Sequence, residues 1–112
     1  MQSFMKVGVL IVLLAGAFAS GIRAEENVVD LRFENRRFSP QNLTVTANQR
    51  FIIKLFNASK ETIEFESFKL DREKVVGPGE TAMIYIPALK PGRYDFYDDF
   101  HEDVPEGTIL VK

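Results

Sequence analysis

Short runs of alternating apolar and polar residues, separated by turn-forming residues, limit what this chain can fold into. Leu43–Ala47 alternates with a period of two, and Phe51–Phe56 is a nearly continuous apolar run. Both patterns are typical of short β-strands, the second of a strand buried on both faces. No helical period persists for three turns. The pattern therefore predicts an all-β sandwich of one domain, without internal repeats or linkers.

Further runs between turn residues complete the expected set of strands. We expect strands at Val28–Phe33, Leu43–Ala47, Phe51–Phe56, Thr62–Phe68, Thr81–Pro87, Arg93–Tyr97 and Gly107–Lys112. Residues 70–76 are ambiguous, and a short helix or an irregular crossover would also fit them. Met83 is expected to face opposite to Ile84 and Ile86. As the one methionine outside the N-terminal segment, it is interpreted as a core residue rather than a thioether ligand.

The N-terminal segment has the order of a secretory signal. Lys6 is followed by the apolar run Val7–Phe18 and then by small residues. The run is too short for a comfortable membrane span. We expect cleavage after Ala24, which leaves an exported domain of residues 25–112; an uncleaved N-terminal anchor is the alternative.

Composition excludes several classes of function. Two of the 14 basic residues and none of the 16 acidic ones lie in the signal, so the exported domain has a net charge of −4. Such a domain is a poor nucleic-acid binder and has no polybasic patch for anionic lipid. The chain contains no cysteine, which excludes disulfides and a thiolate blue-copper centre. Stability must come from the core, to which ten phenylalanines can contribute.

The most unusual segment is Asp95–Glu106, in which six of twelve residues are acidic and none is basic. It also contains the single histidine, His101. Clustered carboxylates repel one another, and a divalent or trivalent cation relieves that repulsion. Carboxylate oxygens with one imidazole suit iron, manganese, zinc or copper(II) better than copper(I). Asp98 and His101, three residues apart, resemble a ligand pair; a solvated acidic loop is the alternative.

A second acidic pair lies on an expected strand. Glu64 and Glu66 are two residues apart, so both side chains point to one face. This arrangement is common on a solvated sheet edge, and it also places two carboxylates where they could approach His101. Tyr94 resembles a tyrosine corner that fixes a loop. Arg36 and Arg37 fit either a contact with a partner or anion, or an exposed hairpin end.

Several of these segments together resemble a cupredoxin. Phe38–Pro40, Leu43–Val45 and Phe51–Asn57 are similar to its opening strands, and Pro91–Tyr97, His101 and Gly107–Val111 to its closing copper loop. The resemblance covers essentially the whole exported domain and implies a Greek-key β-sandwich. In copper-binding members such as plastocyanin, this loop carries a cysteine, a histidine three residues later, and usually a methionine. Here Asp98 stands at the cysteine position and His101 at the histidine position, with Pro105 or Glu106 near the methionine position. Glu64 or Glu66 replaces the upstream histidine.

A narrower resemblance is to small periplasmic cupredoxin-like proteins that accompany bacterial high-affinity iron permeases. The segments that carry it are Glu64–Ser67, Arg72–Val76 and Phe96–Asp103. It implies a periplasmic protein that handles iron, copper or both, with an inner-membrane iron permease and other periplasmic iron-uptake components as partners. The expected metal ligands are Asp98 and His101, completed by Glu64 or Glu66 and by Asp99, Glu102 or Glu106.

Three functions remain open at this point. The leading hypothesis is iron binding and delivery in a ferrous iron uptake system, with Fe(II) oxidation as an open possibility. The first alternative is copper-dependent electron transfer by a cupredoxin that lacks the cysteine ligand. The second is a metal-free sandwich that serves as an interaction module.

Overall fold

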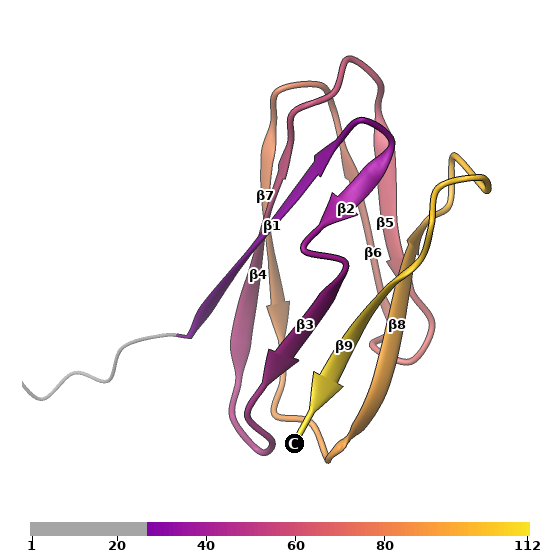
Figure 1. The fold of residues 1–112 in the computed structure, drawn as a ribbon. Helices are drawn as coiled ribbons and strands as arrows, with labels where there is room; N and C mark the ends of the chain where they lie inside the picture. The colour runs from indigo at the N-terminus through magenta and orange to yellow at the C-terminus, as the bar shows by residue number, and fades with distance from the viewer. Residues whose placement is uncertain (1–26) are drawn as a thin grey trace, which may run out of the picture.

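A computed structural model describes residues 27–112, and the predicted signal segment, residues 1–24, lies outside this range. Within the described residues, nine strands form two sheets (Figure 1). The strands are β1 (Val28–Glu34), β2 (Arg37–Ser39), β3 (Asn42–Val45), β4 (Phe51–Asn57), β5 (Ile63–Ser67), β6 (Arg72–Val76), β7 (Thr81–Ile86), β8 (Gly92–Asp98) and β9 (Gly107–Val111). Residues 27–112 contain no helix long and apolar enough to cross a membrane.

The two sheets have the orders β2-β1-β4-β7 and β3-β9-β8-β5-β6. The pairs β1–β4 and β3–β9 are parallel, and the other pairs are antiparallel. Each strand expected from the sequence is present, which confirms the all-β prediction. The short helix considered for residues 70–76 is absent, because Arg72–Val76 forms β6 instead. Its Val76 pairs with Ile63 of β5, and this β-branched pair packs into the core.

The core lies between the sheets and contains a cluster of aromatic rings. Phe38 packs edge-on against Phe33 and Phe96, with ring centroids 5.1 Å apart in both pairs, and Phe65 stacks on Phe96 at 5.2 Å. All four are buried. Burial of one such side chain stabilises the fold by about 1.5–3 kcal/mol, which is how a domain without disulfides remains folded.

Two structural expectations about single residues have different outcomes. The Tyr94 hydroxyl donates a hydrogen bond of 2.9 Å to the carbonyl of Lys90, which confirms the tyrosine corner. Met83 faces opposite to Ile84 and Ile86, as expected, but it is 41% exposed, so its assignment to the core was wrong. The pleat of β7 buries the two isoleucines and leaves the methionine outside.

One end of the sandwich, here called the loop end, collects four connections (Figure 1). They are the β1–β2 turn, the β4–β5 loop, the β6–β7 turn and the β8–β9 loop. Buried Asn57 ties two of them together. Its side-chain amide donates hydrogen bonds to the carbonyls of Glu61, Val76 and Gly77, and its oxygen accepts from Ser59. The loop end is therefore held in one arrangement from within the core.

Candidate metal centre

His101 is fixed at the loop end by the buried carboxylate of Asp98. The Nδ1 atom of His101 lies 2.6 Å from Oδ2 of Asp98, whose side chain is fully buried. Oδ1 of Asp98 accepts hydrogen bonds of 3.0 Å from the backbone N–H groups of Glu64 and Phe100. Because an ionised carboxylate has no hydrogen to donate, Nδ1 is the donor in this contact, and Nε2 is the ring atom left for other contacts. Carboxylates orient metal-binding histidines in the same way.

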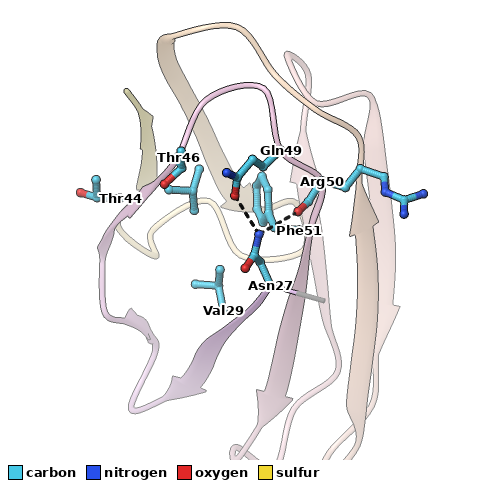
Figure 2. Close-up of a pocket in the computed structure, with 8 residues that line it drawn as sticks. Asn27, Val29, Thr44, Thr46, Gln49, Arg50 and Phe51 are labelled. Carbon is cyan, nitrogen blue, oxygen red and sulfur yellow. Dashed lines mark hydrogen bonds between the residues drawn. The ribbon is translucent and has the colours of Figure 1, made fainter. Parts of the chain in front are cut away.

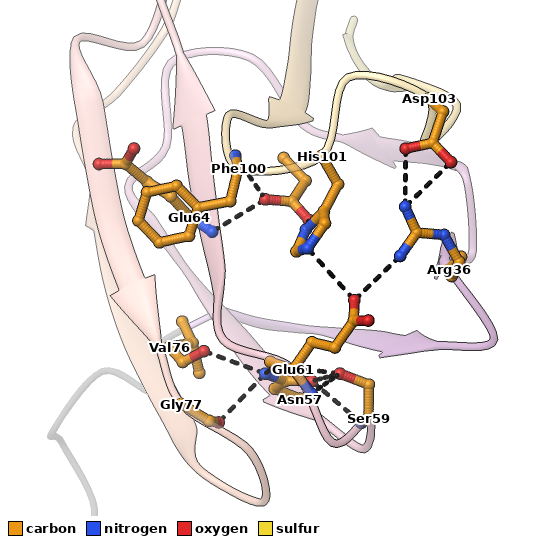
Figure 3. Close-up of polar contacts among 11 residues, drawn as sticks. Arg36, Asn57, Ser59, Glu61, Glu64, Val76, Gly77, Phe100, His101 and Asp103 are labelled. Carbon is orange, nitrogen blue, oxygen red and sulfur yellow. Dashed lines mark hydrogen bonds and ion pairs between the residues drawn. The ribbon is translucent and has the colours of Figure 1, made fainter.

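The other ring nitrogen faces a carboxylate that the sequence analysis did not select. Nε2 of His101 lies 3.2 Å from Oε1 of Glu61 (Figure 3). The same oxygen accepts a hydrogen bond of 2.9 Å from Arg36, which also donates to both oxygens of Asp103 at 2.7 and 2.9 Å. We call Arg36, Glu61, Asp98, His101 and Asp103 the His101 cluster. It joins three connections of the loop end.

Glu64 of β5 contacts this cluster through its backbone N–H, while the side chains of Glu64 and Glu66 lie on the opposite face of the strand. Asp98 pairs with Phe65, and both are buried, whereas Glu66 pairs with Tyr97 on the outer face. Glu64 is two residues from Glu66 and shares that outer face. Figure 3 shows the carboxylate of Glu64 pointing away from His101. The predicted ligands therefore fall into two groups on either side of the β5–β8 pair.

The outer group is a compact cluster of carboxylates. Oxygen atoms of Glu64, Glu66 and Asp99 all lie within 4.8 Å of one another. The backbone N–H of Asp99 donates 2.9 Å to the carbonyl of Glu64, which holds the start of the β8–β9 loop against β5. Glu73 of β6 pairs directly with Glu66. We call Glu64, Glu66, Glu73 and Asp99 the acidic face. Its glutamates on β5 are half-buried.

The electrostatics of the acidic face favour a cation. Partial burial raises the pKa of Glu64, and the charges of Glu73, Glu66 and Asp99 raise it further. Burial likewise raises the pKa of Glu66, with Asp99 and Glu73 adding to the effect. The pKa of the Tyr97 phenol is also raised, first by burial and then by the surrounding carboxylates. A raised pKa means that the ionised form of each group is disfavoured at this position, and a bound cation would relieve that cost.

The remaining predicted ligands lie at the edges of these groups. Glu102 is exposed on the β8–β9 loop, and within residues 27–112 its carboxylate makes no hydrogen bond or ion pair. Glu106 is also exposed; its carbonyl accepts a hydrogen bond from Gln41, and its charge contributes to the raised pKa of Tyr97. The roles of both residues stay predictions.

A shallow pocket at the opposite end of the sandwich has no metal-binding character (Figure 2). It lies where β1 and β4 begin and β3 ends, and Asn27 closes one side by donating to Gln49 and to the carbonyl of Arg50. The residues lining it include no histidine and no carboxylate. The chemistry of the described part of the chain is therefore concentrated at and beside the loop end.

Comparison with known proteins agrees with this architecture. The cupredoxin-like domain family matches residues 6–111 of the chain. This chain belongs to that family. The uncharacterized protein RP394 of Rickettsia prowazekii (strain Madrid E) is 33% identical over 91 residues, which cover 80% of this chain and 73% of the relative.

Solved structures show the same cupredoxin-like fold. The metal-binding domain of CopA, a Cu(I)-exporting P-type ATPase of Streptococcus pneumoniae D39 solved with Cu(I), has a TM-score of 0.69 at 15% identity, and the match covers 80% of this chain and 91% of that domain. Reduced auracyanin of Roseiflexus castenholzii has a TM-score of 0.64 at 16% identity, with 80% and 99% covered. At these identities the likeness establishes the fold alone.

The residues at the loop end do not fit a thiolate copper centre. The chain has no cysteine. Asp98, which the resemblance places at the cysteine position, uses one oxygen for two backbone N–H groups and the other for His101. A buried carboxylate engaged in this way positions the imidazole and is poorly placed to bind a metal directly. Direct metal ligation by Asp98 stays a prediction.

Sequence reasoning missed three members of the His101 cluster and one of the acidic face. Glu73 lies on β6, whose pairing with the strand carrying the two glutamates is not indicated by any alternating pattern in the sequence. Arg36, Glu61 and Asp103 lie in three different connections, and no periodicity relates them. Arg36 drew attention only as one of two adjacent arginines at a hairpin end.

Proposed function

We propose that this chain is an exported metal-binding protein that holds an iron ion on the acidic face and delivers it within a ferrous iron uptake system. The observation that supports this most is the convergence of Glu64, Glu66 and Asp99, whose oxygens lie within 4.8 Å of one another. An inner-membrane iron permease and other periplasmic iron-uptake components are the proposed partners, and the periplasm is the proposed location. The narrow resemblance of the same segments to permease-associated proteins supports both.

The donor set of the acidic face suits iron by its chemistry. Hard carboxylate oxygens stabilise Fe(III) more than Fe(II), and no soft sulfur ligand competes. The site would therefore lower the reduction potential of bound iron and favour the ferric state. The face is open, with Asp99 exposed and both glutamates of β5 half-buried. Openness of this kind suits binding and release to a partner better than repeated catalytic turnover.

Anaerobic calorimetric titration of the purified protein with Fe(II) tests the proposed site. Glu64→Gln, Glu66→Gln and Asp99→Asn each remove one charge at nearly constant volume, and each should weaken binding. Asp30→Asn makes the same change at an exposed side chain on β1, in the other sheet, and should leave binding unaltered. If all four variants bind Fe(II) with the affinity of the wild type, the acidic face is excluded as the iron site. A reversible copper couple without iron binding would favour the copper electron-transfer alternative.

The place in iron uptake needs a separate test. Deletion of the gene should slow growth under iron limitation, and the wild-type gene should restore growth where the gene for the Glu64→Gln, Glu66→Gln and Asp99→Asn triple variant does not. Normal growth of the deletion strain under iron limitation, with iron binding intact in vitro, would contradict the uptake role while leaving the metal site standing.

A further inference from the structure

Strand β7 has one edge that is not paired with another strand. The sheet order β2-β1-β4-β7 places β4 on one side of β7 and, within residues 27–112, no strand on the other. The carbonyl of Tyr85 faces this open side, because it accepts a hydrogen bond of 3.0 Å from Nε of Arg72 instead of pairing with β4. Successive residues of a paired strand direct their backbone groups to alternate sides. The N–H and C=O groups of Thr81 and Met83 therefore face the open side as well.

The open edge of β7 lacks the features that keep sheet edges from pairing with another chain. Such edges are commonly protected by charged side chains, by proline, or by being very short. Among the other three edge strands of the described residues, β6 carries the charged run Arg72–Lys74. The edge strands β2 and β3 have only three and four residues, and Pro40 lies between them. Strand β7 has six residues, Thr81–Ile86, and none of them is charged, proline or glycine.

Apolar side chains border this open edge. A surface groove lies between β6 and β7, and Val75 and Met83 are among the residues that line it from the two strands. Met83 and Tyr85 are 41% and 62% exposed, although residues of their types are more often buried at least in part. A strand added beside β7 would cover these side chains and pair the free backbone groups at the same time.

We propose that the protein dimerises through β7, whose open edge pairs antiparallel with β7 of a second copy about a two-fold axis at Met83. The four-stranded sheets of the two copies then form one continuous sheet. In this register Met83 lies opposite Met83 of the second copy, and Tyr85 lies opposite Thr81 of the second copy. All three residues direct their backbone groups to the open edge, so each opposed pair exchanges two hydrogen bonds. A two-fold interface must be self-complementary, and this uncharged strand meets that requirement.

The charges at the two ends of β7 explain why a second copy is the partner. Arg72 bonds to the carbonyl of Tyr85 at one end, and Glu80 directly precedes Thr81 at the other. Because Tyr85 lies opposite Thr81 of the second copy, each Arg72 comes beside Glu80 of the other copy. These opposite charges match at both ends of the interface. The carbonyl of Tyr85 has two lone pairs, so it can accept from Arg72 and from the second copy together.

Sedimentation equilibrium of the purified protein over a series of concentrations tests the proposal, with a chelator present so that no metal ion bridges two molecules. The mass should rise from one chain to two. Met83→Lys places two like charges opposite each other at the two-fold axis and should weaken dimerisation by about tenfold. Leu110→Lys makes the same change at a side chain of equal exposure, 41%, on β9 of the other sheet, and should leave dimerisation unaltered. A wild type that stays monomeric throughout, or a Met83→Lys variant that dimerises as tightly as the wild type, would overturn the proposal.

Hydrogen exchange of single backbone amides tests the register. The N–H of Met83 faces away from β4, so it should exchange quickly in dilute protein and become protected as the concentration rises. The N–H of Ile84 faces β4, whose Ile53 it opposes, and should be protected at every concentration. Dimerisation without added protection at Met83 would place the interface on another surface and contradict the proposal.

Discussion

At the scale of single residues, Asp98 is the side chain on which the arrangement of the loop end depends most. A carboxylate at a fully buried position is costly unless its oxygens are satisfied, and three contacts satisfy this one. Two of them are hydrogen bonds from the backbone N–H groups of Glu64 and Phe100. The third selects the tautomer of the imidazole. Oδ1 of Asp98 therefore holds the backbone of the loop end, and Oδ2 of the same side chain orients the imidazole of His101.

Substitution of Asp98 should separate these two roles. Asp98→Ala leaves two backbone N–H groups without acceptors, at a cost of about 1–3 kcal/mol for each buried group. Asp98→Asn can keep those bonds through its carbonyl while its amide donates to Nδ1, which moves the hydrogen of the ring to Nε2. Urea unfolding should show the larger loss for alanine, and ¹⁵N spectra of His101 should show the tautomer change for asparagine alone. Asp99→Asn is the control, and retention of the Nδ1 hydrogen in Asp98→Asn would contradict this account.

Gly107 is a second residue whose identity is fixed by its neighbours. A Cβ atom added there would lie 2.2 Å from Cζ of Phe96, in the middle of the aromatic cluster. Gly107→Ala should therefore force Phe96 to move, with an overpacking cost of about 1–3 kcal/mol. At Gly92 the nearest atom to an added Cβ is 3.6 Å away, an ordinary contact, so Gly92→Ala should change stability little. Equal unfolding midpoints in urea for the two variants would refute the steric argument.

At the scale of elements, the β4–β5 loop depends on one buried amide at the end of β4. Asn57 is fully buried and bonds both to its own loop and to the end of β6. Asn57→Ala removes the amide that donates to these buried carbonyls. The free energy of unfolding should fall by about 1–3 kcal/mol or more. It should also loosen Glu61, so the ion pair with Arg36 should weaken. Asn42→Ala, at an exposed position that begins β3, should have almost no effect on the urea midpoint.

The elements also show what sequence could and could not predict. Period-two alternation placed Glu64 and Glu66 on one face, because that periodicity follows from the pleat alone. Strand β2 has three residues, too few for any period. The charged run Arg72–Lys74 of β6, of which Glu73 and Lys74 are exposed, hides the pairing of this strand with β5. The contact between Arg36 and Asp103 joins connections 67 residues apart. Such a contact depends on how both sheets pack, which no local pattern contains.

At the scale of the whole molecule, the fold places one acidic group on each side of a strand pair. Asp98 and Asp99 are neighbours in the sequence, but Asp98 ends β8 and is buried, whereas Asp99 begins the β8–β9 loop and joins the acidic face. The resemblance to cupredoxins predicted the sandwich correctly, since it rests on many hydrophobic positions. It was less informative on ligands, because the acidic residues of a single loop can be distributed over two faces in many ways.

The acidic face should make stability and metal binding respond to pH in opposite directions. The pKa values of Glu64 and Glu66 are raised above their ordinary value of 4.5 in the folded protein. The folded state therefore binds protons more tightly than the unfolded state at these two groups. It follows that their contribution to stability falls as pH rises from about 4.5 through the raised values. Metal binding must displace the same protons, so affinity should rise over that range.

This opposition yields a test on the intact molecule. Glu64→Gln removes one of the repelling charges, so at neutral pH the metal-free variant should melt at a higher temperature than the wild type. The same variant should gain less stability on addition of Fe(II), because one ligand is gone. Thermal melts at pH 4 and pH 7, with and without metal, measure both effects. At pH 4 the two metal-free proteins should melt at similar temperatures, since the glutamate is then protonated. If metal-free Glu64→Gln is less stable than the wild type at pH 7, the carboxylate of Glu64 stabilises the fold. Repulsion among the carboxylates of the acidic face would then not be the cost that a bound cation relieves.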